Sequence, residues 1–305
     1  MSNESHSAPA HRLQLLKGFA AAAAVIVVWS GFNIVSRLGG RSPLTPYDMA
    51  GIRFAFSGIV CMPFVLARWQ RLPWPRLAVL AVLGGMSYAL FVYSGFSLAP
   101  TAHAGILVNG GIPFASALLA WLILGRRPGI RSEFALLVAG LGIVLIGLHS
   151  FGQFSGAPAH QWVGDVFFLL AAVCYACFGL LLKHWHVSPL DATIGIAVIS
   201  MACYTPVYLL FLPKAIATVP LSFLLLQGVY QGILAASIAG LLFAYAIHNI
   251  GPQRATLMLA MVPGISAVAA VPLLGESLDA VTLAGVVLVT TGAVLGATHQ
   301  SAKRG

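Results

Sequence analysis

Long apolar runs alternate with short polar breaks along this chain, and the pattern predicts helices that cross a membrane. A bilayer core of about 30 Å needs roughly 20 apolar residues in helical form, and backbone exposed to lipid must satisfy its own hydrogen bonds. The runs that meet this length are 18–36, 46–67, 75–98, 102–124, 131–149, 162–182, 190–212, 221–248, 252–274 and 279–297. We therefore predict an all-α polytopic membrane protein with ten transmembrane helices.

The chain also repeats itself. Residues 102–149 match residues 252–299 at a constant offset of 150. The aligned pairs include Leu107 with Leu257, Pro113 with Pro263, Ser116 with Ser266, Leu124-Gly125 with Leu274-Gly275, and Gly142 with Gly292. Weaker echoes at offsets of 146 and 143 pair Trp29 with Tyr175, Arg37 with Lys183, and Asp48 with Asp191. Because a unit of five helices is odd, its second copy enters the membrane from the opposite side, which predicts two inverted five-helix repeats, a common transporter design.

This repeat divides the chain into four parts. We expect a cytoplasmic tail at 1–16, a first repeat at 17–150, a second repeat at 151–299 and a second cytoplasmic tail at 300–305. The first apolar run has the features of a cleaved signal peptide as well. Its match to the run that starts near residue 162 favours a retained helix.

Composition and charge argue against a soluble protein and against a nucleic-acid-binding protein. Hydrophobic residues make up 59% and charged residues 8% of the chain, whereas soluble domains carry about 25% charged residues. The formal charge of +9 would suit nucleic acid, but its placement follows the positive-inside rule. With a cytoplasmic N-terminus, twelve Lys and Arg fall in inside segments and three, Arg37, Arg41 and Lys214, in outside segments. We therefore expect both termini in the cytoplasm, contact with membrane lipid and no nucleic-acid partner.

Several motifs resemble one family. They are Trp29-Ser-Gly-Phe-Asn33, the Arg53-Phe54 pair, and the Leu-Gly ends followed by Arg126 and Glu276. Over about residues 18–297 the chain resembles the EamA-type branch of the drug/metabolite transporter superfamily, and within it most the YddG-type exporters of aromatic and other neutral amino acids. The resemblance implies a bacterial inner-membrane exporter of amino acids and related metabolites, without a cofactor. Arg126 departs from the glutamate that the family usually has there.

Proline and glycine interrupt two matching helices. Pro113 and Pro263 each remove a hydrogen bond near the middle of an apolar run. Gly110 and Gly111 precede the first proline, and Gly264 follows the second. These positions are either hinges that open one side of the membrane while the other closes, or static kinks. The hinge interpretation predicts alternating access to a central cavity.

Large or polar side chains at mid-depth mark the expected cavity, since polar groups in lipid are costly and face the bundle interior. The predicted substrate-binding residues are Trp29, Asn33, Tyr88, Phe91, His103, Asn109, Tyr175, Tyr230 and Ser237. For any single aromatic residue, core filling or an interfacial belt is the simpler interpretation. Gln227 and Gln231 share one side of the eighth helix with Tyr230.

The positions of the ionisable residues restrict the choice of substrate and the coupling of transport to protons. The seven acids all lie in the tail or near span ends, so no central carboxylate can exchange protons; His103 and His248 are the available substitutes. We favour facilitated diffusion or exchange, with a proton-coupled drug/metabolite efflux carrier as the alternative. Arg53 is the clear intramembrane cation, and snorkelling or a local hydrogen bond is its expected state. So few cations argue against phosphorylated substrates and favour zwitterionic amino acids, held by amides and by backbone at the broken helices.

Other chemistries have weaker support. Cys174 and Cys177 have the spacing of metal ligands but no neighbouring His or acid, so we expect small packing residues and no metal site. An intramembrane enzyme would need a nucleophile such as Ser266 beside a base, and neither repeat has a central histidine, so we expect no catalytic residue. A channel is a third alternative. Close helix contact at Gly228-x-x-x-Gly232 leaves the oligomeric state open, with a monomer as the working expectation.

Overall fold

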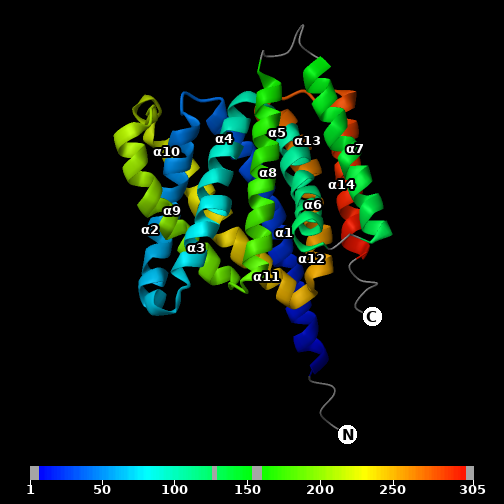
Figure 1. The fold of residues 1–305 in the computed structure, drawn as a ribbon, viewed down its shortest axis with the longest axis horizontal. Coiled ribbons are helices and arrows are strands. Elements are labelled where there is room, and N and C mark those ends of the chain that lie inside the picture. The colour runs from blue at the N-terminus through cyan, green and yellow to red at the C-terminus, as the bar shows by residue number, and fades with distance from the viewer. Residues whose placement is uncertain (1–6, 126–128, 153–159, 300–305) are drawn as a thin grey trace.

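A computed structural model describes residues 7–125, 129–152 and 160–299, and these residues are almost entirely helical, with no strand among them (Figure 1). The elements are α1 (Ser7–Gly40), α2 (Pro46–Arg68), η1 (Trp69–Arg71), α3 (Trp74–Leu80), η2 (Ala81–Ser87), α4 (Tyr88–Leu98), α5 (Thr101–Ala104), η3 (Gly105–Asn109), α6 (Gly111–Leu124), α7 (Ile130–Gly152), α8 (Gln161–His184), α9 (Pro189–Phe211), η4 (Ile216–Thr218), α10 (Leu221–Gln227), η5 (Gly228–Ile238), α11 (Ala239–Ile250), α12 (Pro252–Leu259), α13 (Val262–Leu274) and α14 (Ala280–His299).

Within the described ranges, ten helical segments are long and apolar enough to cross a membrane. They are Arg12–Gly40, Pro46–Arg71, Trp74–Leu98, Thr101–Leu122, Ser132–Ser150, Gln161–His184, Pro189–Phe211, Leu221–Ile250, Pro252–Leu274 and Ala280–Thr298. Each corresponds to one predicted run, so the prediction of an all-α membrane protein with ten spans is confirmed. The first helix begins earlier than hydropathy predicts, at Ser7, and Leu15 from the expected tail packs against the buried cluster around Ile250.

The helix contacts are reciprocal between the two halves of the chain. α1 packs on α11 and α13, and its counterpart α8 packs on α4 and α6. The pairs α2 with α9 and α7 with α14 join matching helices. α1 begins and α14 ends at the same end of the bundle, and α8 runs opposite to α1 (Figure 1). We call the end that holds Gly40 and Gln161 the outer end, after the orientation that the charges predict, and the opposite end the inner end.

The spans that contain Pro113 and Pro263 both have the predicted interruption. In the fourth span a wide, π-type turn, η3, ends at Asn109, and α6 starts at Gly111. In the ninth span α12 ends at Leu259 and α13 starts at Val262. Both spans then end on the aligned glycines, Gly125 with φ of 63° and Gly275 with φ of 64°. This left-handed conformation terminates a helix and suits glycine because no Cβ clashes with the backbone.

Core packing differs between the two ends. The largest buried cluster lies in the outer half and includes Tyr93, Phe96 and Phe168. In the inner half the described core divides into two separate clusters, one around Leu77 and Leu80 and the other around Ala246. The bundle is therefore continuous near its outer end and divided near its inner end.

Asp48 fixes the outer start of α2. Its carboxylate accepts hydrogen bonds from the Thr45 backbone N–H and hydroxyl at 2.8 Å each, from the Tyr208 hydroxyl, and from the Ala215 backbone N–H at 3.0 Å. The Thr45 hydroxyl in turn caps the helix. The fully buried Asp48 thus joins the first half of the chain to the second, because Tyr208 and Ala215 belong to α9 and the segment after it.

Asp48→Asn is expected to lower the free energy of unfolding by about 2 kcal/mol, because an amide nitrogen cannot accept the hydrogen bonds that one carboxylate oxygen accepts. Thermal unfolding of the detergent-purified protein measures this. Asp191→Asn is the matched control at the repeat-related position, where the half-buried side chain binds Ser188 and Arg68. A loss at Asp191 as large as the loss at Asp48 would contradict the interpretation.

Candidate functional site

The side chain of Arg53 points into the bundle rather than toward the membrane surface. Its Nη1 donates a hydrogen bond of 3.5 Å to the Tyr93 hydroxyl, and its guanidinium carbon lies 5.6 Å from the centre of the Phe32 ring. Tyr88 and Tyr175 lie close enough to interact with its charge. The structure therefore shows the local hydrogen bond that was one of the two expected states of Arg53, and it places the Phe32 and Tyr93 side chains against the guanidinium.

A buried polar network continues from Arg53 to the eighth span. The Tyr93 hydroxyl donates to Gln231 Oε1 at 3.3 Å, and Gln231 Nε2 donates to the Ser36 hydroxyl at 2.9 Å. One turn away, Gln227 Nε2 donates to the Val35 carbonyl at 3.0 Å. Both glutamines are fully buried. The first, second, third and eighth spans are thus joined around one cation.

Among the acids that the structure describes, none pairs with Arg53. Asp48 binds Tyr208, Asp165 binds His103, Asp191 binds Arg68, Glu276 binds Arg37, Asp279 binds His149, and Glu133 is exposed. A buried charge without a counter-charge costs several kcal/mol. Arg53 also has five N–H donors and only the long bond to Tyr93 among the described residues. The site is therefore suited to receive an anionic group such as a carboxylate.

Aromatic side chains extend this site between the third and sixth spans. The rings of Tyr88 and Tyr175 lie 5.0 Å apart, and Phe91 stacks on Phe167 at 6.1 Å. All four side chains are half-buried. Three of them are predicted binding residues: Tyr88 contacts Tyr175, and Phe91 lies one turn from Tyr88 on α4.

The other predicted binding residues lie elsewhere. Trp29 contacts the Phe243 ring at 5.6 Å, and Tyr230 donates to the Val28 carbonyl at 3.3 Å, so both lie between α1 and the eighth span. The remaining four are separated: Asn33 donates to Ser266 at 3.2 Å, Asn109 is half-buried at the end of η3, Ser237 donates to the Gly232 carbonyl at 3.0 Å, and His103 lies near the outer end.

The predicted hinge residues lie at the two helix interruptions. Gly110 falls between η3 and α6, Gly111 begins α6, and Pro113 lies in its first turn. Pro263 and Gly264 lie in the first turn of α13. The backbone hydrogen bonding is therefore interrupted just before each proline.

Glu276 ties the two halves together at the outer end. Its Oε1 accepts from Arg37 Nε at 2.9 Å and from Arg41 Nη2 at 3.1 Å, and its Oε2 accepts from the Thr101 backbone N–H at 2.9 Å. Arg37 also donates to the Phe96 carbonyl and Arg41 to the Leu274 carbonyl, at 2.6 Å each. We call Arg37, Arg41, Thr101 and Glu276 the outer latch. Arg126, the repeat counterpart of Glu276, lies outside the described residues.

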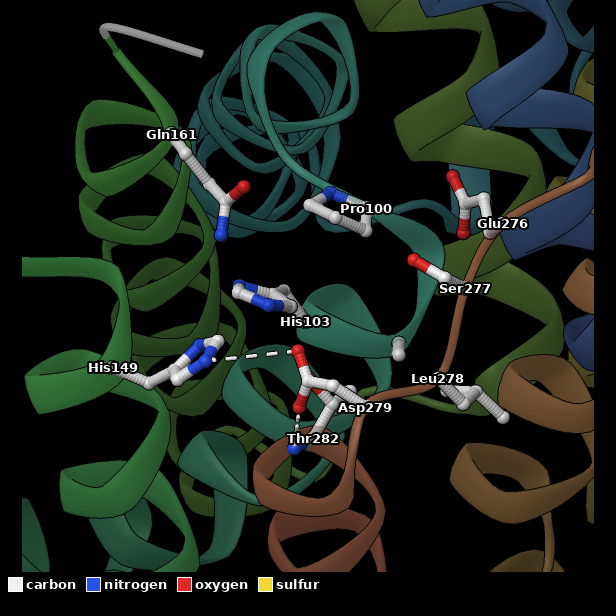
Figure 2. A pocket seen from close by; sticks show the side chains of 10 residues that line it. Pro100, His103, His149, Gln161, Glu276, Ser277, Leu278, Asp279 and Thr282 are labelled. Carbon is white, nitrogen blue, oxygen red and sulfur yellow. Dashed lines mark hydrogen bonds and ion pairs between the residues drawn. The ribbon is translucent and has the colours of Figure 1, made fainter. Parts of the chain in front are cut away.

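A pocket of about 200 Å³ lies beside the latch (Figure 2). Its lining includes His103, His149, Gln161, Glu276 and Asp279. His103 Nδ1 lies 2.8 Å from Asp165 Oδ1, and His149 Nε2 lies 3.6 Å from Asp279 Oδ2. In Figure 2 the two histidines and Asp279 face the same space from different elements. At the inner end an ion pair joins Arg68 to Asp191 at 3.0 Å.

Tyr93 and Phe32, which contact Arg53, were not among the predicted binding residues, and Arg53 itself was expected only to snorkel or to form a local hydrogen bond. The available signal was the charge of Arg53 itself, since an ionisable group within a span is a functional candidate by default. Its partners carried no such signal, because one tyrosine or phenylalanine in an apolar run resembles any other.

Comparisons with known proteins agree with this architecture. The EamA-like transporter family matches the chain twice, at residues 16–148 and 162–298. YedA of Escherichia coli strain K12, an uncharacterized inner membrane transporter, is 28% identical over 92% of this chain and 93% of its own. A solved crystal structure with 23% identity aligns with a TM-score of 0.61 over 96% of this chain and 98% of its own, and so shares the fold.

Two relatives with more informative names also match. The aromatic amino acid exporter YddG of Ancylobacter novellus is 26% identical over 62% of this chain and 66% of its own. A probable terminal-alkyne amino-acid exporter of Streptantibioticus cattleyicolor is 25% identical over 93% of this chain and 94% of its own. Two family matches that together span most of the ten-helix bundle settle the assignment: the chain is a membrane transporter that belongs to the EamA-like transporter family.

Proposed function

We propose that the protein is an alternating-access carrier that exports neutral amino acids, aromatic ones among them, through a site at Arg53 between the two repeats. The observation that carries this proposal is a half-buried guanidinium that contacts Phe32 and Tyr93 and has no acidic partner among the described residues. The names of two relatives, which describe amino-acid exporters, support the same substrate class.

Arg53 would hold the substrate carboxylate. A guanidinium binds a carboxylate through two parallel N–H···O bonds, which are strong because both groups are charged. Tyr93 and, through it, Gln231 would keep the guanidinium in place. Rings such as Tyr88 and Tyr175 would contact an apolar or aromatic side chain, and an aromatic face also suits the α-ammonium group.

The outer end is held closed by the outer latch, and the inner core is divided into two clusters. Both features fit a carrier in its cytoplasm-facing state. Opening the outer end would require breaking the Glu276 contacts while the inner clusters close on one another. The interruptions at Gly110-Gly111-Pro113 and at Pro263-Gly264 would serve as the hinges. We assign the repeats to 17–150 and 151–299, place both termini in the cytoplasm of a bacterial cell, and propose exchange or facilitated diffusion.

Uptake into liposomes tests this proposal. We expect purified protein to move labelled phenylalanine and other neutral amino acids with saturation and counterflow, and to move phenethylamine, which lacks the carboxylate, at least about tenfold more slowly because the Arg53 contact is lost. A pH gradient imposed across the liposome membrane should not drive phenylalanine to accumulate above its equilibrium level; such accumulation would favour the proton-coupled alternative. Equal rates for the amino acid and the amine would contradict a carboxylate site.

A further inference from the structure

The four described ion pairs at the outer end each join an acid of the second half of the chain to a base of the first half. The acids Asp165, Glu276 and Asp279 all belong to the second half, and their partners Arg37, Arg41, His103 and His149 all belong to the first half. Every one of these contacts therefore holds the halves together at the outer end. Glu276 has two permanently charged partners, whereas Asp165 and Asp279 each face a histidine.

The His103–Asp165 contact is the buried one of the two histidine contacts. Both side chains are less than a tenth exposed, and the buried Asp165 Oδ2 has no hydrogen-bond partner among the described residues. With a neutral His103 the pair carries one uncompensated negative charge, and with a protonated His103 it is neutral overall. Because uncompensated buried charge is costly, the closed outer end favours the protonated pair.

Among the described residues, no cation other than His103 pairs with Asp165. Arg37 and Arg41 from α1 are bound to Glu276, the α4 tyrosine Tyr93 is bound to Gln231, and α13 has no titratable side chain. His149 from α7 and Asp279, just before α14, face the pocket from its other side.

Asp279 stays charged while a histidine titrates. Partial burial would raise the pKa of Asp279, but hydrogen bonds from Thr282 and the nearby His149 together lower it below its ordinary value. Its side chain is 47% exposed and 3.6 Å from His149, so this contact is weak. The response to pH should therefore depend mainly on His103.

We propose that His103 and Asp165 form a proton-binding site that controls the outer end: a proton taken from the outer solution through the pocket converts His103 to imidazolium, completes the ion pair and holds the two halves closed. Loss of the proton leaves Asp165 uncompensated and favours opening, because water can then solvate it. Imidazole groups titrate between about pH 5 and 8, so acidic outer solution stabilises closure and alkaline solution weakens it. This inference rests on the alternating-access part of the proposed function and not on the substrate.

Distances between spin labels at the outer end test the proposal. The labels replace two exposed residues, Pro43 and Ser277, in full-length protein whose four cysteines are changed to alanine, reconstituted in nanodiscs. Between about pH 5.5 and about pH 8.5 we expect the ratio of separated to close label pairs to rise about tenfold, the change that one charge-assisted hydrogen bond supports. His103→Gln, which keeps a hydrogen bond without a charge, and Asp165→Asn should each abolish this rise, and His149→Gln should leave most of it.

The outcomes separate the two proposals. If His103→Gln keeps the parental pH response, or if sodium at constant pH produces the shift, the proton site is wrong. Glu276→Gln should separate the labels at every pH, since it breaks the latch directly. If Glu276→Gln opens the outer end and the pH response survives in His103→Gln, only the proton site fails. If no variant and no pH separates the labels, alternating access itself fails.

Discussion

Arg53→Gln is expected to slow the transport of neutral amino acids about a hundredfold. The variant loses two charge-assisted hydrogen bonds to the substrate carboxylate, together about 3 kcal/mol. Counterflow of labelled phenylalanine in liposomes measures the loss. Arg53→Lys keeps the charge but not the planar fork that binds a carboxylate through two bonds, so it should retain intermediate activity. Phenethylamine, which lacks the carboxylate, should move at similar rates in all three proteins.

Stability separates a binding role of Arg53 from a structural one. Because none of the described acids pairs with Arg53, removing its charge should leave the thermal unfolding temperature unchanged or raise it, as burying an unpaired charge is unfavourable. Substrate should raise the unfolding temperature of the parent by mass action and have no such effect on Arg53→Gln. A folded Arg53→Gln protein that transports at the parental rate would refute the proposed site.

Glu276→Gln is expected to shift the carrier strongly toward an open outer end. The variant leaves Arg37, which is 12% exposed, without its charged partner, and breaking a buried ion pair costs about 3 kcal/mol or more. The ratio of outer-open to outer-closed protein should therefore rise about a hundredfold. The fully buried Thr101, changed to cysteine in a cysteine-free protein, should then react with a membrane-impermeant thiol reagent added from outside.

Two control variants define how the latch works. Arg41→Gln should give a much smaller shift, because Arg41 is 40% exposed and exposed ion pairs contribute about 1 kcal/mol or less. Asp191→Asn breaks the inner pair with Arg68 and should not increase labelling from outside. If the Thr101→Cys thiol is labelled no faster in Glu276→Gln than in the parent, Glu276 does not hold the outer end closed.

The sequence predicted what depends on local pattern. Ten apolar runs determined the ten helices, and the aligned prolines located the interruptions before α6 and α13. Tyr88 and Tyr175 were predicted as binding residues because bulky polar or aromatic groups at mid-depth are conspicuous in the sequence, and their rings contact each other. Asn33, Ser237 and Tyr230 were equally conspicuous, and each of them hydrogen-bonds to a partner other than Arg53.

By itself, then, the sequence determined that the helices lie in a lipid bilayer, how many spans there are, that they are duplicated and where they are interrupted. These properties can be predicted because hydrophobicity, helix length and proline chemistry act within a single segment. Only the tertiary structure decided that Arg53 meets Tyr93, that Gln231 meets Ser36, and that Glu276 binds Arg37 across 239 residues of chain. The physical reason is that a helix apolar on most of its circumference does not specify which side faces its neighbours. That choice comes from the packing of all ten helices together.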